Sequence, residues 1–217
     1  MTDLPRRTIT AAIYAAVVLV AVLAPREVLA VLLAIMAGLV LLELRGLRRA
    51  GLPAWLELGL VALGIVALLY LRDLTAPPLG VWGASGPLLM TLLAVWAADV
   101  GAYLVGSAIG RRKIVPRISP GKTWEGTIAG FFAAALVIVL WNRPFAGLPA
   151  WAVVTAVLVG PIAFAGDLLE SWVKRRAHVK DSGTLLPGHG GMLDRIDSLV
   201  AAAPLVAGAI LFLGRMG

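Results

Sequence analysis

The sequence lacks cysteine and is poor in charge. None of its 217 residues is cysteine, which excludes a disulfide framework and any metal site built on cysteine. Charged residues make up 14% of the chain and hydrophobic residues 60%, against about 25% and about 45–50% in ordinary soluble domains. These deviations exclude an ordinary soluble enzyme and predict an all-α, polytopic integral membrane helix bundle.

The chain also lacks the sequence features of a nucleic-acid-binding protein, although its net charge is +7. Aromatic residues do not alternate with basic ones, as they do on surfaces that stack bases. The basic residues instead concentrate between the apolar segments, where they would meet anionic lipid headgroups. We therefore expect a lipid bilayer, and no nucleic acid, as a partner.

Apolar segments of suitable length recur along the whole chain. A helix needs about 20 mostly apolar residues to cross a bilayer. The candidate segments are residues 9–24, 27–43, 54–71, 87–109, 125–141, 150–171 and 196–214. The sequence thus predicts about seven transmembrane helices in one membrane domain. We divide it into N-terminal helices (1–75) and a catalytic region (76–217).

The basic residues also predict the orientation of this bundle. With the N-terminus in the cytoplasm, fifteen of the 19 lysine and arginine residues lie on the cytoplasmic side. The other four are Arg26, Arg72, Arg143 and Arg215. The positive-inside rule therefore favours a cytoplasmic N-terminus. The two longest charged loops, 110–124 and 172–195, would then face the cytoplasm, and the C-terminus would not.

The most polar stretch of the chain, residues 171–197, combines basic and acidic residues with two glycine-bearing turns. Its candidate catalytic residues are Lys174, Arg175, Lys180, Asp181, Asp194, Arg195 and Asp197. Cations of this kind suit phosphate groups, and carboxylates suit a divalent metal that bridges phosphates. Such a cluster brings no stability to a membrane-embedded bundle, so we interpret it as a site.

Acidic side chains also occur within the apolar segment that precedes this stretch. Asp167, Glu170, Ser171 and Lys174 would share one face of a helix. An internal contact of Asp167 with Lys174 or Ser171 is one interpretation. Because acids at membrane depth are costly and usually functional, we favour Asp167 as a catalytic and metal-binding residue.

The partner of Asp167 would come from the last helix. Asp194 and Asp197 stand three residues apart at the start of that helix, where either could also complement the helix dipole. A carboxylate from each of two helices makes a natural site for a hard cation. We therefore expect Asp167 to meet Asp194 or Asp197.

The other charged loop contains a Gly-Lys-Thr sequence that ends at Thr123, but it lacks the first glycine of a P-loop. That motif requires glycine at position 116, where the chain has Pro116. Ser119, Lys122 and Thr123 could still bind phosphate oxygens near a helix N-terminus. A helix start with Ser119 as N-cap and Pro120 in the first turn is an alternative that is compatible with this role.

Two further polar residues leave alternatives open. Asp99 lies within an apolar segment and is either a polar contact between helices or part of the site. The small residues Gly101, Gly106 and Gly110 on the same segment would allow another helix to approach closely. His189 stands between glycines and is either a hydrogen-bonded structural group or a substrate-binding residue.

These motifs resemble a known family. The run from Ser171 to Asp197 resembles the signature of the phosphatidate cytidylyltransferase (CDP-diacylglycerol synthase) family at every defined position. The sequence from Ser119 to Gly126 resembles the second motif of that family, and the sequence from Gly166 to Ser171 resembles its acidic helix. The similarity covers roughly the C-terminal 120 residues of the chain.

The resemblance implies an enzyme of phospholipid biosynthesis that transfers a cytidylyl group from CTP to phosphatidic acid, giving CDP-diacylglycerol and pyrophosphate. It implies a Mg²⁺ cofactor on Asp167 and Asp194, with an added monovalent cation left open. Substrate binding would fall to Ser119, Lys122, Thr123, Ser171, His189, Gly190 and Gly191. The family resemblance also implies a homodimer in the cytoplasmic (inner) membrane with a cytoplasm-facing site.

Three other functions remain as alternatives. Two are related lipid enzymes that use CTP, a CDP-archaeol synthase and a polyprenol kinase. The third is a membrane transporter, which would use the intramembrane acids Asp99 and Asp167. A transporter would leave the dense loop 172–195 unexplained, and no inverted repeat is visible.

Overall fold

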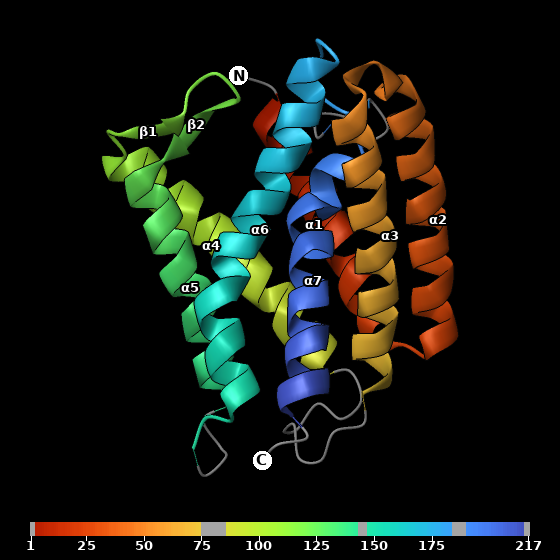
Figure 1. Ribbon diagram of the computed structural model, residues 1–217, viewed down its shortest axis with the longest axis vertical. Coiled ribbons are helices and arrows are strands. Elements are labelled where there is room, and N and C mark those ends of the chain that lie inside the picture. The colour runs from red at the N-terminus through yellow and green to blue at the C-terminus, as the bar shows by residue number, and fades with distance from the viewer. Residues whose placement is uncertain (1–2, 75–85, 143–146, 184–189, 215–217) are drawn as a thin grey trace.

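The computed structural model describes residues 3–74, 86–142, 147–183 and 190–214, without the side chains of residues 3–9 and 11. Seven α-helices run up and down through these residues (Figure 1). They are α1 (Asp3–Leu23), α2 (Arg26–Gly46), α3 (Leu52–Asp73), α4 (Gly86–Ile109), α5 (Trp124–Asn142), α6 (Ala150–Arg176) and α7 (Leu193–Leu213). A short 3₁₀ helix, η1 (Arg48–Ala50), joins α2 to α3.

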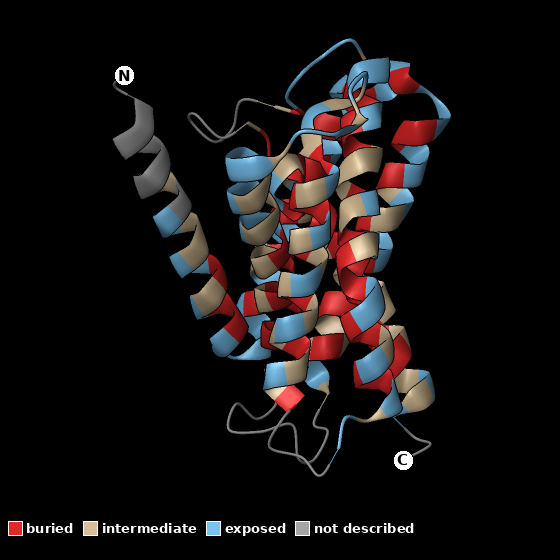
Figure 2. Cartoon of the chain, turned by 90° about the vertical axis from the view of Figure 1, so that its left-hand side faces the viewer, coloured by how far each residue is buried: buried red, intermediate tan, exposed pale blue. Residues whose placement is uncertain are grey.

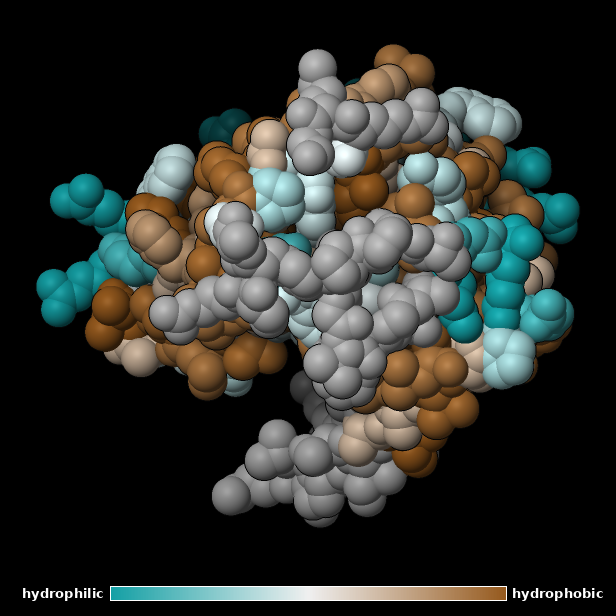
Figure 3. All heavy atoms as spheres, turned by 90° about the horizontal axis from the view of Figure 1, so that it is seen from below, coloured by the Kyte–Doolittle hydropathy of each residue, from teal (hydrophilic) through white to brown (hydrophobic). Residues whose placement is uncertain are grey.

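The predicted membrane bundle is confirmed. Six of the helices that the structure describes, α2 to α7, are long and apolar enough to cross a bilayer. The apolar part of α1 is the shorter stretch Ala12–Leu23. Hydrophobic atoms dominate the flanks seen from the end that carries the C-terminus (Figure 3). Large apolar side chains such as Val66 and Phe132 face outward, as a lipid-facing surface requires.

The helices pack in the order α2, α3, α7, α6, α5, α4, with α7 in the centre. Buried residues line the contacts between them, while α1 stands to one side (Figure 2). Among its described side chains, α1 buries Val18, Ala21 and Val22 near its C-terminal end. The central position of α7 means that residues at its start can be reached from several helices.

Small residues bring α4 and α5 into close contact, as the sequence predicted for Gly101, Gly106 and Gly110. A Cβ atom on Gly101 would lie 3.0 Å from Ala133 Cβ of α5, and one on Gly106 would lie 3.5 Å from Gly126 Cα, whereas one on Gly110, just after α4, would lie 2.6 Å from the Thr123 hydroxyl oxygen of the loop. Helices that expose small residues to each other can pack backbone against backbone. This contact fixes the loop between α4 and α5 relative to the bundle.

That loop forms a small β-hairpin of β1 (Lys113–Val115) and antiparallel β2 (Ser119–Thr123). The alternative of a helix start with Ser119 as N-cap is therefore wrong, and the segment predicted from residue 125 agrees with the structure. The helix begins at Trp124, and the Thr123 hydroxyl accepts the Gly126 N–H at 3.2 Å, which is the geometry of an N-cap. Strand pairing keeps the residues before Thr123 extended, which a helix starting at Pro120 would not allow.

The two charged loops lie at the same end of the bundle. The Arg175 Nε atom in α6 donates to the Ile118 carbonyl in the hairpin at 3.1 Å. At the other end, Arg26 pairs with Asp73 at 3.1 Å. The side of the membrane that each end faces, and the division into regions 1–75 and 76–217, stay predictions.

Candidate active site

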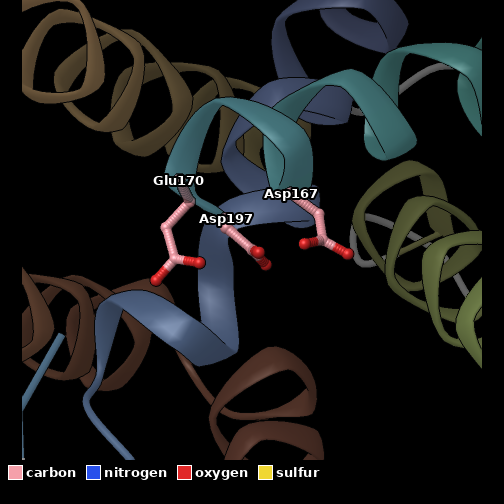
Figure 4. Close-up of side chains that lie close together, drawn as sticks. All are labelled: Asp167, Glu170 and Asp197. Atoms are coloured by element: carbon pink, nitrogen blue, oxygen red, sulfur yellow. The ribbon is translucent and has the colours of Figure 1, made fainter. Parts of the chain in front are cut away.

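Three carboxylates converge between α6 and α7. Asp167 and Glu170 come from α6 and Asp197 from α7, and Figure 4 shows their side chains pointing to the same side. One carboxylate oxygen from each lies within 4.8 Å of the others. We call these three residues the carboxylate cluster. Glu170 and Asp197 are buried and Asp167 is half-buried, so the cluster is open on the Asp167 side.

Lys174 lies beside the cluster and is largely buried. Its Nζ atom is 2.5 Å from Glu170 Oε2, one turn earlier on α6, and 2.5 Å from Asp194 Oδ1 on α7. The ammonium thus offsets two negative charges in the interior of the bundle. The predicted sharing of one helix face by Asp167, Glu170, Ser171 and Lys174 is confirmed by this pair and by the Ser171 hydroxyl, 3.4 Å from Asp167 Oδ1.

Asp194 is bound on both oxygens by protein donors. Oδ1 contacts Lys174, and Oδ2 accepts the Gly191 N–H at 2.7 Å and the Ser182 N–H at 3.1 Å. The Ser182 hydroxyl also lies 2.9 Å from Oδ2. Of the two partners expected for Asp167, Asp197 therefore joins the cluster. Asp194 instead bonds to Lys174 and to Ser182 and Gly191 of the loop before α7.

Lys122 reaches the cluster from the hairpin and forms an ion pair with Asp167. Its Nζ atom also lies 4.9 Å from the centre of the Phe164 ring, a cation–π contact. The two side chains of the ion pair are 22% and 27% exposed, so the pair can be reached by a ligand. The hairpin thus places one cation at the open side of the cluster.

Two cavities meet at Asp99 of α4. The first, about 290 Å³, lies between α4, α5, α6 and β2 and is lined by Asp99, Lys122, Thr123, Phe164 and Asp167 among others. The second, about 380 Å³, lies between α1, α4 and α7, and its lining includes Tyr14, Trp96, Asp99, Asp194, Arg195 and Asp197. Asp99 therefore belongs to the site region, and the cluster borders one cavity through Asp167 and the other through Asp197.

Comparison with known proteins identifies the family of the chain. Residues 53–213, from α3 to the end of α7, match the model of the cytidylyltransferase family. The chain belongs to the cytidylyltransferase family. The resemblance predicted from the sequence is thereby confirmed at the level of the family.

Individual members of the family agree with this match. The chain is 51% identical over 113 residues to the phosphatidate cytidylyltransferase of Brucella suis, an alignment that covers 52% of this chain and 42% of the relative. It is 46% identical over 137 residues to that of Pseudomonas aeruginosa (62% and 50%). For the Haemophilus influenzae protein of the same name the values are 45% over 127 residues (54% and 43%). The matched part of the chain thus corresponds to half or less of each relative's length.

The remaining predicted site residues of the chain take different positions. Arg175 binds the carbonyls of Ile118 and Val179 and so joins the two loops. Lys180, Asp181 and Arg195 are exposed, and Arg195 lines the second cavity. Their catalytic roles stay predictions.

The predicted substrate-binding residues are likewise distributed around the site. Ser119 is half-buried at the start of β2, and Gly190 has a positive φ of 80°. A Cβ on Gly190 would lie 2.7 Å from Asp194 Oδ2, and one on Gly191 would lie 2.1 Å from the Ser182 hydroxyl. Both glycines therefore make room for the polar contacts of the loop. His189 lies outside the described residues.

Three acids near the site were not among the predicted site residues. Glu170 completes the cluster, Glu57 of α3 is fully buried near Lys174, and Glu43 of α2 bonds to the start of α7. Each stands in an apolar segment, and isolated acids in such segments are usually functional. That signal would have identified all three as candidates, but which acids converge depends on helix packing.

Proposed function

We propose that the chain transfers a cytidylyl group from CTP to phosphatidic acid, giving CDP-diacylglycerol and pyrophosphate. The observation that carries this proposal is the carboxylate cluster between two cavities, with Lys122 at its open side. Family membership and the names of the relatives support a cytidylyl transfer, and the apolar helices around the cluster support a lipid substrate.

The carboxylate cluster fits a divalent cation such as Mg²⁺. Its three residues supply the oxygen ligands that hard cations prefer. The Glu170 Oε1 atom is buried and has no hydrogen-bond partner among the described residues, so it is available as a ligand. A cation bound there would neutralise phosphate charge and hold phosphate oxygens in place. The cluster shares Asp167 with the predicted ligand pair of Asp167 and Asp194, and it has Glu170 and Asp197 in place of Asp194. Whether a monovalent cation joins Mg²⁺ stays open.

The two cavities suggest separate places for the two substrates. We assign the phosphates of CTP to the first cavity, because Lys122 lies there and an ammonium serves a triphosphate as a point charge. We assign phosphatidic acid to the second cavity, which combines apolar residues such as Trp96 and Leu199 with Arg195. The two phosphate groups would then meet near Asp99 and the carboxylate cluster.

The chemistry requires little acid–base help from the protein. A phosphate monoester such as phosphatidic acid has a second pKa near 6, so its oxygen is already largely anionic at neutral pH. That oxygen attacks the α-phosphorus of CTP, the bond from the α-phosphorus to the β-phosphate oxygen breaks, and pyrophosphate leaves. The protein's task is to reduce the repulsion between the two anions, for which Lys122 and Arg195 are placed.

The test uses purified protein in detergent with phosphatidic acid, Mg²⁺ and CTP labelled in either the α- or the γ-phosphate. We expect α-label in a lipid product and γ-label in pyrophosphate, in equal amounts. A polyprenol kinase would instead place γ-label in the lipid. A CDP-archaeol synthase would prefer an ether-lipid acceptor to phosphatidic acid, and a transporter would label no lipid.

We further propose that both charged loops face the cytoplasm from the inner membrane and that the protein is a homodimer. Because the native chain lacks cysteine, a single cysteine at Arg176 reports its side of the membrane cleanly. Labelling by an impermeant reagent applied only from outside would contradict the orientation. A monomer mass from light scattering, corrected for detergent, would contradict the dimer.

A further inference from the structure

We propose that Glu43 is a positioning residue for the proposed cytidylyl transfer, because it holds the start of α7 and the loop before it in place from α2. Glu43 precedes the region that matches the family model, which begins at residue 53. The inference rests on the proposed function for its kinetic part only.

Glu43 is buried and accepts hydrogen bonds from residues about 140 to 150 positions away in the chain. Its Oε1 atom accepts the Met192 N–H at 2.7 Å, and Oε2 accepts the Leu193 N–H at 2.9 Å. The Ser182 hydroxyl lies 3.1 Å from Oε2. Only 7% of the residue is exposed, so water cannot replace these bonds without opening the bundle.

These contacts make Glu43 the cap of α7. Met192 is the N-cap of the helix, and its own side chain makes no capping hydrogen bond. The first N–H groups of a helix have no partner within the helix and need an acceptor. A carboxylate at this position also interacts favourably with the helix dipole. Glu43, which lies on a different helix, supplies both the acceptor oxygens and the negative charge.

The capped turn carries the acids of the site. Asp194 and Asp197 lie in the first two turns of α7, and Asp194 shares Ser182 with Glu43. The Ser182 N–H binds Asp194, and the Ser182 hydroxyl, with its single proton, lies between the two carboxylates, 2.9 Å from Asp194 Oδ2 and 3.1 Å from Glu43 Oε2. Any shift of Glu43 therefore moves Asp194 through Ser182 and Asp197 through the helix start.

The loop is also shaped to admit the Glu43 side chain. A Cβ atom on Gly183 would lie 2.8 Å from Glu43 Oε1, and one on Gly191 would lie 2.7 Å from each carboxylate oxygen. At contacts this short something must shift, so a side chain at either position would displace the Glu43 carboxylate from its place. Two glycines of the signature stretch thus leave space for an acid from outside that stretch.

The first test replaces Glu43 with an isosteric neutral group and measures the backbone directly. In Glu43→Gln the amide has one acceptor oxygen, and its NH₂ group opposes one of the two backbone N–H donors. We expect the Met192 and Leu193 amides to exchange with deuterium at least about tenfold faster than in the native protein, because their protection depends on this bond. Mass spectrometry of peptides covering residues 190–198 in detergent measures the exchange. Unchanged exchange at both amides would overturn the proposal, whether or not the protein transfers cytidylyl groups.

The second test separates positioning from general stability. We expect Glu43→Gln to lower kcat by about 10–100-fold, the usual cost of losing a group that orients a site, with a change in KM for CTP of about threefold or less. The control is Val40→Ala, which removes buried volume one turn earlier on α2 and no hydrogen-bonding group. It should lower the melting temperature and keep kcat within about twofold of the native value. Equal loss of kcat in both variants would assign Glu43 a purely structural role and overturn the proposal.

A further variant covers the case in which Glu43→Gln does not fold. Ser182→Ala removes one of the three donors near Glu43 together with the hydroxyl contact to Asp194, and it keeps the Ser182 N–H bond to Asp194, so exchange at Leu193 is the readout that reports on Glu43. We expect a fall in kcat of about three- to tenfold and faster exchange at Leu193, which shares Oε2 with the hydroxyl. Native values for both would contradict the proposal. Absence of cytidylyl transfer by the native protein would contradict the proposed function, and the exchange measurement would still decide the placement of α7.

Discussion

Two lysines in this bundle pair with carboxylates, and their surroundings differ. Lys122 comes from a hairpin, meets the single acid Asp167 and faces a cavity. Lys174 comes from a membrane helix, meets Glu170 and Asp194, and its side chain is only 11% exposed. The half-buried pair can exchange its partner for a phosphate at lower cost, because solvent partly screens the charges. The buried pair cannot, because each charge left alone would be desolvated without compensation. We infer that Lys122 serves a substrate and that Lys174 maintains the site.

The largest effect should come from Lys174→Met, which leaves Glu170 and Asp194 without their shared cation. Breaking a buried ion pair from one side costs about 3–5 kcal/mol. We expect a clear fall in the melting temperature in detergent, together with loss of activity. Lys113→Met, at an exposed lysine of β1, is the control and should melt like the native protein. If Lys174→Met melts normally, the two lysine sites do not differ as described.

Asp167→Asn, at the Lys122 pair, should lower activity without lowering stability. The asparagine keeps the size and one acceptor oxygen of Asp167 but loses the charge for a cation and for Lys122. We expect activity to fall by about 10²–10³-fold, the scale of losing one preorganised electrostatic group, while the melting temperature changes little. Asp73→Asn, at the opposite end of the bundle, should keep native activity. Near-normal activity of Asp167→Asn at limiting Mg²⁺ would remove Asp167 from the site.

Lys122→Ala should have a smaller and more selective effect. Removing a charged partner of the triphosphate should raise the KM for CTP by about tenfold, corresponding to one charge-assisted hydrogen bond. The KM for phosphatidic acid should change much less, because we place that substrate in the other cavity. Steady-state kinetics with each substrate varied in turn measure the difference. A selective effect on phosphatidic acid would reverse the assignment of the two cavities.

The smallest effect concerns Glu57, the acid near Lys174 that is not bonded to it. The residue is 0% exposed, and neither carboxylate oxygen has a hydrogen-bond partner among the described residues. Glu57→Met replaces an uncompensated polar group by an apolar one of similar size and should stabilise the protein by about 1 kcal/mol. Glu170→Met removes a direct partner of Lys174 and should destabilise the protein. Thermal melting of the two variants compares them, and a loss of stability in Glu57→Met would show that its charge supports Lys174.

The sequence determined the fold class and part of the composition of the site. Apolar segments of membrane-spanning length predicted the bundle, because a chain in lipid must satisfy its backbone within helices. The motif residues predicted the family and a phosphate site containing Asp167 and Lys122. Periodicity alone placed Asp167, Glu170, Ser171 and Lys174 on one face, since residues three and four apart are neighbours on a helix.

Only the tertiary structure decided which of these groups meet. The sequence allowed either Asp194 or Asp197 as the partner of Asp167, and the rotation of α7 against α6 brought in Asp197. Strand pairing, a contact between residues apart in sequence, moved the helix start from Ser119 to Trp124. Glu43 depends on the packing of α2 against a loop about 140 residues later, and no local pattern encodes the distance between two helices.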